Sequence, residues 1–143
     1  MKDINGKIQY KDKEYTLVFN FNVMEKMQEE YGSFEEWGRY SSGEYLAKQK
    51  YDKLGKKKQW YELTDEEKAK YESGEPDIHA VIFAIKEALN EGIDIENEDK
   101  GTNIPPLTFK QVGRIVTEIG YQKATATLHQ LVADSTKSEE KNE

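Results

Sequence analysis

The chain of 143 residues contains no cysteine, so disulfide bonds, thiolate metal sites and thiol catalysis are excluded. Histidine is also scarce, because His79 and His129 are the only two and no His-x-x-x-His pair occurs. We therefore expect no metal site and two partly exposed helical histidines. The glycine-rich phosphate loop, the Gly-x-Gly-x-x-Gly turn and the Gly-x-Ser-x-Gly elbow are absent as well. With so few of the groups that an active site requires, we expect neither an enzyme nor a bound cofactor.

Long apolar runs are missing too. No stretch approaches the ~20 residues that a membrane-spanning helix needs, and the opening MKDINGKIQY contains no apolar core of a signal peptide. A surplus of basic residues is also lacking, since the net charge is −7. General binding of nucleic acid depends on such a surplus to displace counterions from the phosphates. We expect a soluble cytoplasmic protein that binds neither membranes nor nucleic acid.

One acidic stretch, DIENEDKG from Asp94 to Gly101, superficially resembles a calcium loop. An EF-hand loop requires a bidentate glutamate at its last position, the twelfth, but the twelfth residue counted from Asp94 is Pro105. The stretch is therefore interpreted as a solvated acidic loop.

The first structural element that the sequence predicts is a β-hairpin. Ile8 and Tyr10 alternate with polar residues in KIQY, and Tyr15, Leu17 and Phe19 do so in YTLVF. The polar KDKE between the two runs has the length of a hairpin loop. A lone hairpin is marginally stable in water, so its apolar face must pack on helices or on another subunit.

Two short helices are predicted after the hairpin. Asn22 is expected to cap the first helix, with Glu25 completing a capping-box pattern, and Gly32 is expected to end it. Ser33 and Glu36 repeat the box at the start of the second helix. That helix carries three aromatic residues: Phe34, Trp37 and Tyr40.

Residues 41–76 differ in character from the rest of the chain. They are highly charged, with a concentration of lysine between Lys48 and Lys58. Thr64 and Glu67 form a capping box that predicts a short solvated helix over residues 65–71. We interpret the segment as an insertion between two halves of a core. Its aromatic residues indicate that it docks on something: Tyr45, Tyr51, Trp60, Tyr61 and Tyr71.

The second half of the chain is predicted to contain three helices. Asp77 caps the first, and Gly92 is expected to end it. Its apolar stripe consists of Ile78, Val81, Ile82, Ile85, Ala88 and Leu89. Thr108 and Gln111 form a capping box that opens the second helix, and Gly120 ends it. The third helix spans roughly residues 121–133.

Together these patterns predict a mostly helical α+β fold in which an N-terminal β-hairpin packs on about four to five helices. Residues 1–134 are expected to form a single domain, with 41–76 as its charged, aromatic-containing insertion. Residues 135–143 have no apolar anchor and are predicted to be a disordered tail.

Two blocks of sequence resemble a known family. The first is GKIQYKDKEYTLVFNFNVMEKMQEEYGSFEEW, and the second is DIHAVIFAIKEALNEG followed by LTFKQVGRIVTEIG. In their order of elements they resemble the small tail assembly chaperones of long-tailed bacteriophages, in the form found in phages and prophages of Gram-positive bacteria. The blocks cover somewhat under half of the chain. The segment 41–75 is longer than this family leads us to expect between them.

The resemblance implies an assembly function without chemistry. Members of this family coat the helical tape-measure protein before the tail tube polymerises around it, and then leave. We therefore expect the tape-measure protein as partner, self-association, a cytoplasmic location in the host bacterium and absence from the mature virion. Two alternatives are another morphogenesis component, such as a connector or tail-completion protein, and a nucleic-acid-binding regulator that uses residues 48–61.

No catalytic, cofactor-binding or metal-binding residue is expected. The residues expected to contact a partner are aromatic side chains of the second helix and of the inserted segment: Trp37, Tyr40, Trp60 and Tyr61.

Overall fold

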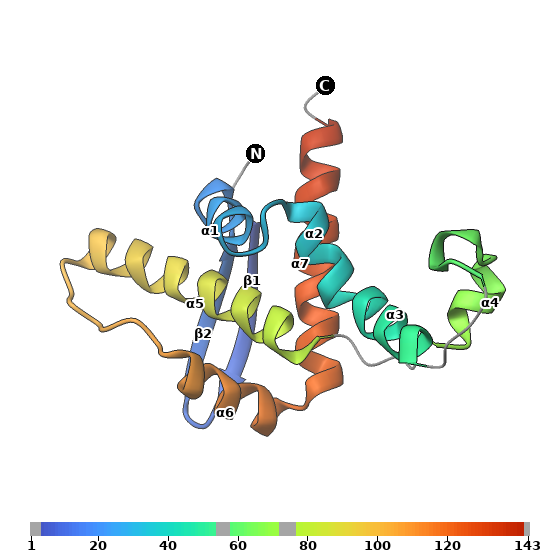
Figure 1. Ribbon diagram of the computed structural model, residues 1–143. Helices are drawn as coiled ribbons and strands as arrows, with labels where there is room; N and C mark the ends of the chain where they lie inside the picture. Colours follow the sequence, from blue (N-terminus) through green and yellow to red (C-terminus); the bar gives the residue numbers. More distant parts are fainter. Residues whose placement is uncertain (1–3, 54–57, 72–76, 142–143) are drawn as a thin grey trace.

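The computed structural model describes residues 4–53, 58–71 and 77–141, and it has a mostly helical α+β fold (Figure 1). Its strands, β1 (Ile4–Tyr10) and β2 (Lys13–Phe19), form an N-terminal antiparallel hairpin that packs on helices, as expected. The described residues contain seven α-helices, not four to five, and one 3₁₀ turn. They are α1 (Phe21–Tyr31), α2 (Phe34–Ser41), α3 (Glu44–Lys53), η1 (Trp60–Glu62), α4 (Asp65–Ala69), α5 (Ile78–Lys100), α6 (Phe109–Ile119) and α7 (Tyr121–Lys141).

The helix that the sequence did not reveal is α3. Its sequence, EYLAKQKYDK, consists largely of good helix formers but carries no continuous apolar stripe. Only Ala47 and Tyr51 are buried in it. Hydrophobic periodicity, the main signal for a helix in sequence, is therefore too weak in this segment to identify it.

The hairpin is tighter than the sequence indicated. Tyr10 pairs with Lys13, so the turn consists of Lys11 and Asp12 alone and not of the four residues KDKE. Lys11 has a φ of 55°, and a positive φ is what a two-residue hairpin turn requires. Ile8 and Leu17 point to the core face, where both are buried.

Helix α1 begins earlier than predicted, because its N-cap is Asn20 and not Asn22. The side-chain oxygen of Asn20 accepts hydrogen bonds from the backbone N–H groups of Asn22 and Val23, at 3.1 and 3.3 Å. Asn20 follows β2 directly and remains extended, with a φ of −147°. The predicted stop is confirmed, since Gly32 ends the helix with a φ of 91°.

Helix α5 continues past Gly92, which was expected to end it. The helix runs to Lys100 and stops at Gly101, whose backbone is left-handed. The predicted acidic loop is therefore helical through Lys100. The reason for a glycine at position 92 is packing, because a Cβ built there would lie 2.4 Å from the carbonyl oxygen of Thr16 on β2. Gly92 allows α5 to cross the strand closely.

The core is organised around α5, which contacts β2, α1, α2, α6 and α7. In Figure 1 this helix crosses in front of the hairpin, with α1 above it and α6 below. Side chains from all these elements are buried together, among them Leu17, Phe19, Met27, Ile85, Leu89, Ile115 and Leu128. The apolar stripe predicted for this helix is confirmed, apart from Ile78, which is exposed.

The predicted start of α6 and the predicted boundary between α6 and α7 agree with the structure. Thr108 and Gln111 form the expected capping box of α6, and Gly120 ends that helix with a φ of 96°. Helix α7 was predicted to stop near residue 133 and to be followed by a disordered tail. It continues through Lys141, because the sequence after Gly120 contains neither glycine nor proline to break it. Residues 142–143 lie outside the described part.

Helices α3 and α4 and the turn η1 form an arm that projects from the body, at the right of Figure 1. Within the described residues, the arm (44–53 and 58–71) meets the body chiefly through contacts between α2 and α3. Its two ends lie side by side, since the backbone N–H of Asp77 donates to the carbonyl oxygen of Tyr40 at 3.1 Å. The chain thus leaves and re-enters the body at one place.

None of the described helices combines the length and apolar character needed to cross a membrane.

Candidate functional site

The structure separates the four aromatic residues that were expected to contact a partner. Trp37 is a core residue, with an exposed fraction of 3%. Its indole Nε1–H donates to the carbonyl oxygen of Ala80 at 2.9 Å, and its ring stacks on Phe34. The polar N–H of the indole is thus hydrogen-bonded, and the ring is covered by its neighbour. Trp37 is therefore not available at the surface.

Tyr40 lies where the body meets the arm. Its ring centroid is 5.3 Å from that of Tyr31 in the body and 4.6 Å from that of Tyr45 in α3. The half-buried Tyr40 thus joins two elements of the same chain. Its observed contacts are internal.

Trp60 belongs to a second, smaller aromatic cluster inside the arm. Its ring makes edge contacts with Tyr51 and Tyr71, at centroid distances of 5.7 and 6.3 Å. The ammonium of Lys68 lies 5.7 Å from the Trp60 ring centroid, within range of a cation–π contact. This cluster gives the arm a core of its own, separate from that of the body.

Tyr61 is the one of the four that faces solvent. Its exposed fraction is 78%, the largest among the exposed large hydrophobic residues of the described chain. Next to it, the carboxylates Glu62, Asp65 and Glu66 are also exposed. No ion pair joins any of these three to another described residue. We call Tyr61, Glu62, Asp65 and Glu66 the arm knob.

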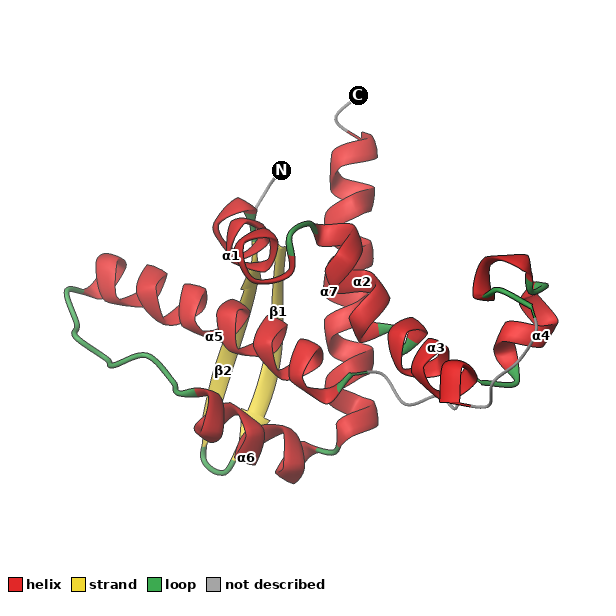
Figure 2. Cartoon of the chain, in the orientation of Figure 1, coloured by secondary structure: helices red, strands yellow, loops and turns green. Residues whose placement is uncertain are grey.

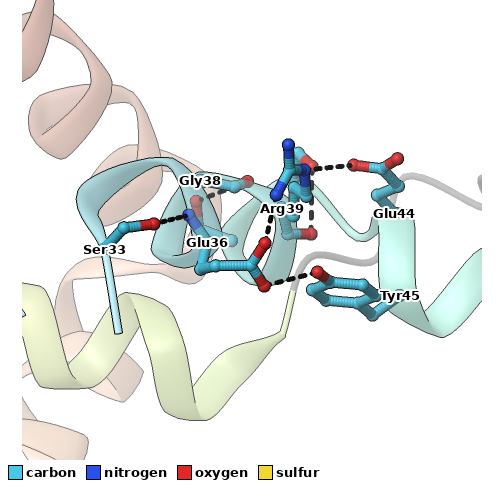
Figure 3. A network of polar contacts seen from close by, with 8 residues as sticks. Ser33, Glu36, Gly38, Arg39, Glu44 and Tyr45 are labelled. Carbon is cyan, nitrogen blue, oxygen red and sulfur yellow. Dashed lines mark hydrogen bonds and ion pairs between the residues drawn. The ribbon is translucent and has the colours of Figure 1, made fainter. Parts of the chain in front are cut away.

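A polar network fixes the root of the arm (Figure 3). The carboxylate of Glu36 in α2 accepts hydrogen bonds from the guanidinium of Arg39 and from the hydroxyl of Tyr45 in α3. The bond from Tyr45, followed by that from Arg39, lowers the pKa of Glu36. Arg39 also faces Glu44, with its Nε 3.9 Å from a carboxylate oxygen. Helices α2 and α3, which follow one another in the chain, are thereby held in one orientation.

The lysines of the arm are partly neutralised by its own acids. Lys48 pairs with Asp52 at 2.9 Å, and Lys58 pairs with Glu67 at 3.5 Å. The lysine-rich segment was predicted to extend across residues 54–57, which lie outside the described residues. What the structure describes is an arm that carries charges of both signs, with the unpaired carboxylates gathered at its knob.

A groove that sequence reasoning missed lies between the hairpin turn and α6. It has a volume of about 680 Å³ and is lined by Tyr10, Lys11, Ile82, Phe109, Lys110 and Arg114, with Gly113, Thr117 and Glu118 completing it. We call it the tip groove. Lys110 and Arg114 are visible in the sequence as neighbours on one helix face. Their approach to Lys11 depends on the tertiary packing of α6 on β1, which no local pattern predicts.

A second groove lies between α1 and α5 and is acidic. Its lining includes Glu25, Glu87, Glu91 and Asp94, with Lys26 as a counter-charge. Within the described chain, no group of three or more His, Asp or Glu side chains is arranged to hold a metal ion. His79 stacks on Phe109, with ring centroids 4.7 Å apart, and the exposed His129 lies on α7 far along the chain.

Comparison of the chain with protein-family models, with curated proteins and with solved structures finds no match. The described surface offers two features suited to binding. One is the arm knob, with its exposed aromatic ring, and the other is the tip groove, whose lining includes apolar and cationic side chains.

Proposed function

We propose that the protein is a phage or prophage tail assembly chaperone that binds the tape-measure protein and acts without chemistry. The observation that carries the proposal is the packing of the two sequence blocks that resemble this family. The hairpin of the first block lies against α5 of the second, and Gly92 of α5 approaches the backbone of Thr16 on β2 closely. Two blocks that are far apart in sequence thus form one structural unit.

The arm knob supports a binding role. Coating a long apolar helix requires a carrier with exposed aromatic surface that binds each segment weakly, since many copies along one filament supply avidity. Tyr61 provides such surface, and the polar network of Glu36, Arg39 and Tyr45 holds the arm that presents it. Trp37 and Tyr40, which were also expected to contact the partner, are left out of this proposal because their observed contacts are internal.

Co-expression with the tape-measure protein of the same phage or prophage tests the proposal. We expect the tape-measure protein to become more soluble and to co-purify with the chain. Tyr61→Ala is expected to reduce the amount recovered several-fold. Phe21→Ala is the matched control, because Phe21 is also exposed, at 57%, but lies on the body. A tape-measure protein that stays equally insoluble and does not co-purify with the unaltered chain would sink the proposal.

The first alternative, a component retained in the virion, is separated by mass spectrometry of finished particles. A chaperone should be absent from them, whereas a connector or tail-completion protein should be present at a fixed copy number. The second alternative, a regulator that binds nucleic acid through residues 48–61, is less well supported. Lys48 and Lys58 already have carboxylate partners, and the acidic knob adjoins them. Absence of binding at low salt would remove it.

A further inference from the structure

The tip groove combines apolar lining residues with cationic side chains that form no ion pair with the described residues, although the ammonium of Lys11 lies 5.3 Å from the ring centroid of Tyr10. Tyr10, Ile82 and Phe109 supply the apolar part. Three cationic side chains also line the groove: Lys11, Lys110 and Arg114. None of them forms an ion pair with another described residue. Among the described residues that line the groove, Glu118 carries the only negative charge. Such a groove fits a ligand that is both acidic and apolar.

The arm knob has this complementary character. The ring of Tyr61 projects into solvent, and close to it in sequence are the exposed carboxylates Glu62, Asp65 and Glu66, none of which forms an ion pair with another described residue. Tyrosine is well suited to fill an apolar site, because it buries a large rigid ring at a small loss of conformational entropy. The groove and the knob are therefore complementary: the groove is cationic and apolar, and the knob is anionic and aromatic.

One chain does not bring its own knob to its own groove. In Figure 2, α4 lies at the outer end of the arm, on the far side of the molecule from α6 and the hairpin turn. The polar network at the root of the arm holds α3 against α2 in this orientation. The complementary surfaces are thus placed for contact between copies.

We propose that the arm knob of one copy docks in the tip groove of a second copy. In this contact the Tyr61 ring packs on Phe109 and Ile82. The knob carboxylates face the cationic rim of the groove. Because the two surfaces differ, the contact is heterologous, and each added copy still presents a free knob or a free groove. Such contacts close into rings or continue as open filaments.

This inference goes beyond tape-measure binding and does not depend on it. A single aromatic anchor with a polar rim makes a small interface, so we expect weak pairwise association. The assembly itself is measurable with the purified chain alone.

Sedimentation of the full chain over a range of concentrations, at low and at moderate salt, tests the proposal. We expect the mean mass to rise with concentration at low salt and to fall as salt screens the charges. Lys110→Glu with Arg114→Glu should abolish the association, and so should Glu62→Arg with Glu66→Arg. Lys26→Glu with Lys100→Glu is the control, because it changes the net charge as the groove variant does but at sites away from both surfaces. The control should associate like the unaltered chain.

Mixing the two disruptive variants provides the decisive measurement. The acidic knob of the groove variant fits the unaltered groove of the knob variant, and the arginine knob fits the glutamate groove. We therefore expect the mixture to associate although neither variant does so alone. Tyr61→Ser, at a position too exposed to affect folding, should weaken the association about tenfold or more.

A chain that stays monomeric at low salt would overturn the proposal, as would disruptive variants that associate normally or a mixture that stays monomeric. A control that loses association as well would also count against it. These outcomes are independent of co-purification with the tape-measure protein. A chain that co-purifies but never self-associates would refute this inference alone. One that self-associates without binding the tape-measure protein would refute the proposed function alone.

Discussion

Gly92 of α5 approaches Thr16 of β2 so closely that a Cβ on the glycine would lie 2.4 Å from the threonine carbonyl oxygen. The obstacle is backbone, which cannot rotate away as a side chain can. An alanine at this position therefore forces the helix and the strand apart. The contact makes a mid-helix glycine necessary where it would otherwise weaken the helix.

Gly92→Ala is predicted to destabilise the protein by about 1–3 kcal/mol, as overpacking of a tight contact does. The matched control is Gly38→Ala, because Gly38 is also helical but has no atom within 4 Å of the added methyl group. The control should gain about 0.5–1 kcal/mol from its higher helix propensity. Urea unfolding measures both. Equal effects of the same sign at the two positions would contradict the close packing.

The cap of α1 gives a second prediction. Asn20→Ala removes the side-chain oxygen that accepts from the first-turn amides and is predicted to destabilise the protein by about 1 kcal/mol. Asn22→Ala, two residues later on an exposed position of the same helix, should change the unfolding midpoint little. If Asn22→Ala lost more stability than Asn20→Ala, the N-cap would be Asn22, as the sequence alone predicted.

These two positions show which parts of the fold are encoded locally. The caps at Ser33, Thr64, Asp77 and Thr108 and the stops at Gly32 and Gly120 were predicted correctly, because each depends on hydrogen bonds or backbone angles within a few residues. Gly92 was misread as a stop because its reason lies in β2, far away in sequence. Asn20 and Asn22 are chemically identical, and only the end of the strand distinguishes them.

The candidate site was less predictable than the fold, for the same reason. Aromatic identity and spacing did not distinguish Trp37, which is buried against α5, from Tyr61, which is exposed to solvent. The tip groove could not be predicted at all, since Lys11 and Arg114 lie on separate elements that tertiary packing brings together. Surfaces made by distant segments leave no periodic signal in sequence.

Tyr31 gives a prediction about alkaline pH. Its hydroxyl is buried without a hydrogen-bond partner among the described residues, and burial, followed by the charges of Asp77 and Glu30, raises the pKa of Tyr31 to about 12. An unfolded tyrosine ionises near a pKa of 10.0. The folded state therefore retains a proton that the unfolded state loses. The stabilisation is complete below pH 10 and is lost as the pH rises toward 12.

Tyr31→Phe should remove this part of the pH dependence. It should also leave the protein as stable at pH 8, or more stable by up to about 1 kcal/mol, because it removes an unsatisfied polar group. Urea midpoints at pH 8 and pH 11 for both proteins measure the effect. Tyr61→Phe, at an exposed tyrosine, is the control and should show the same decline as the unaltered chain. Parallel declines for Tyr31→Phe and the unaltered chain would refute the prediction.

The hydrogen bond between Tyr40 and Asp77 predicts that the body folds without the arm. Replacing residues 42–76 by a short Gly-Ser linker should preserve cooperative unfolding, since the two ends already touch. The loss of the Tyr45 ring from Tyr40 should destabilise the body by about 1 kcal/mol. Circular dichroism and thermal unfolding test this. The same linker in place of α6 is the negative control, because it removes buried Val112 and Ile115 and should prevent folding.

The central position of α5 also has a consequence for the newborn chain. The hairpin, α1 and α2 leave the ribosome first, but the helix that covers them is made only after the whole arm has been synthesised. Until then Leu17 and Phe19 have no cover from α5, and domains with uncovered apolar surface are prone to aggregate during synthesis. A nascent chain stalled before Ile78 should therefore be bound by the general folding chaperones of the cell, and extension through Lys100 should release it.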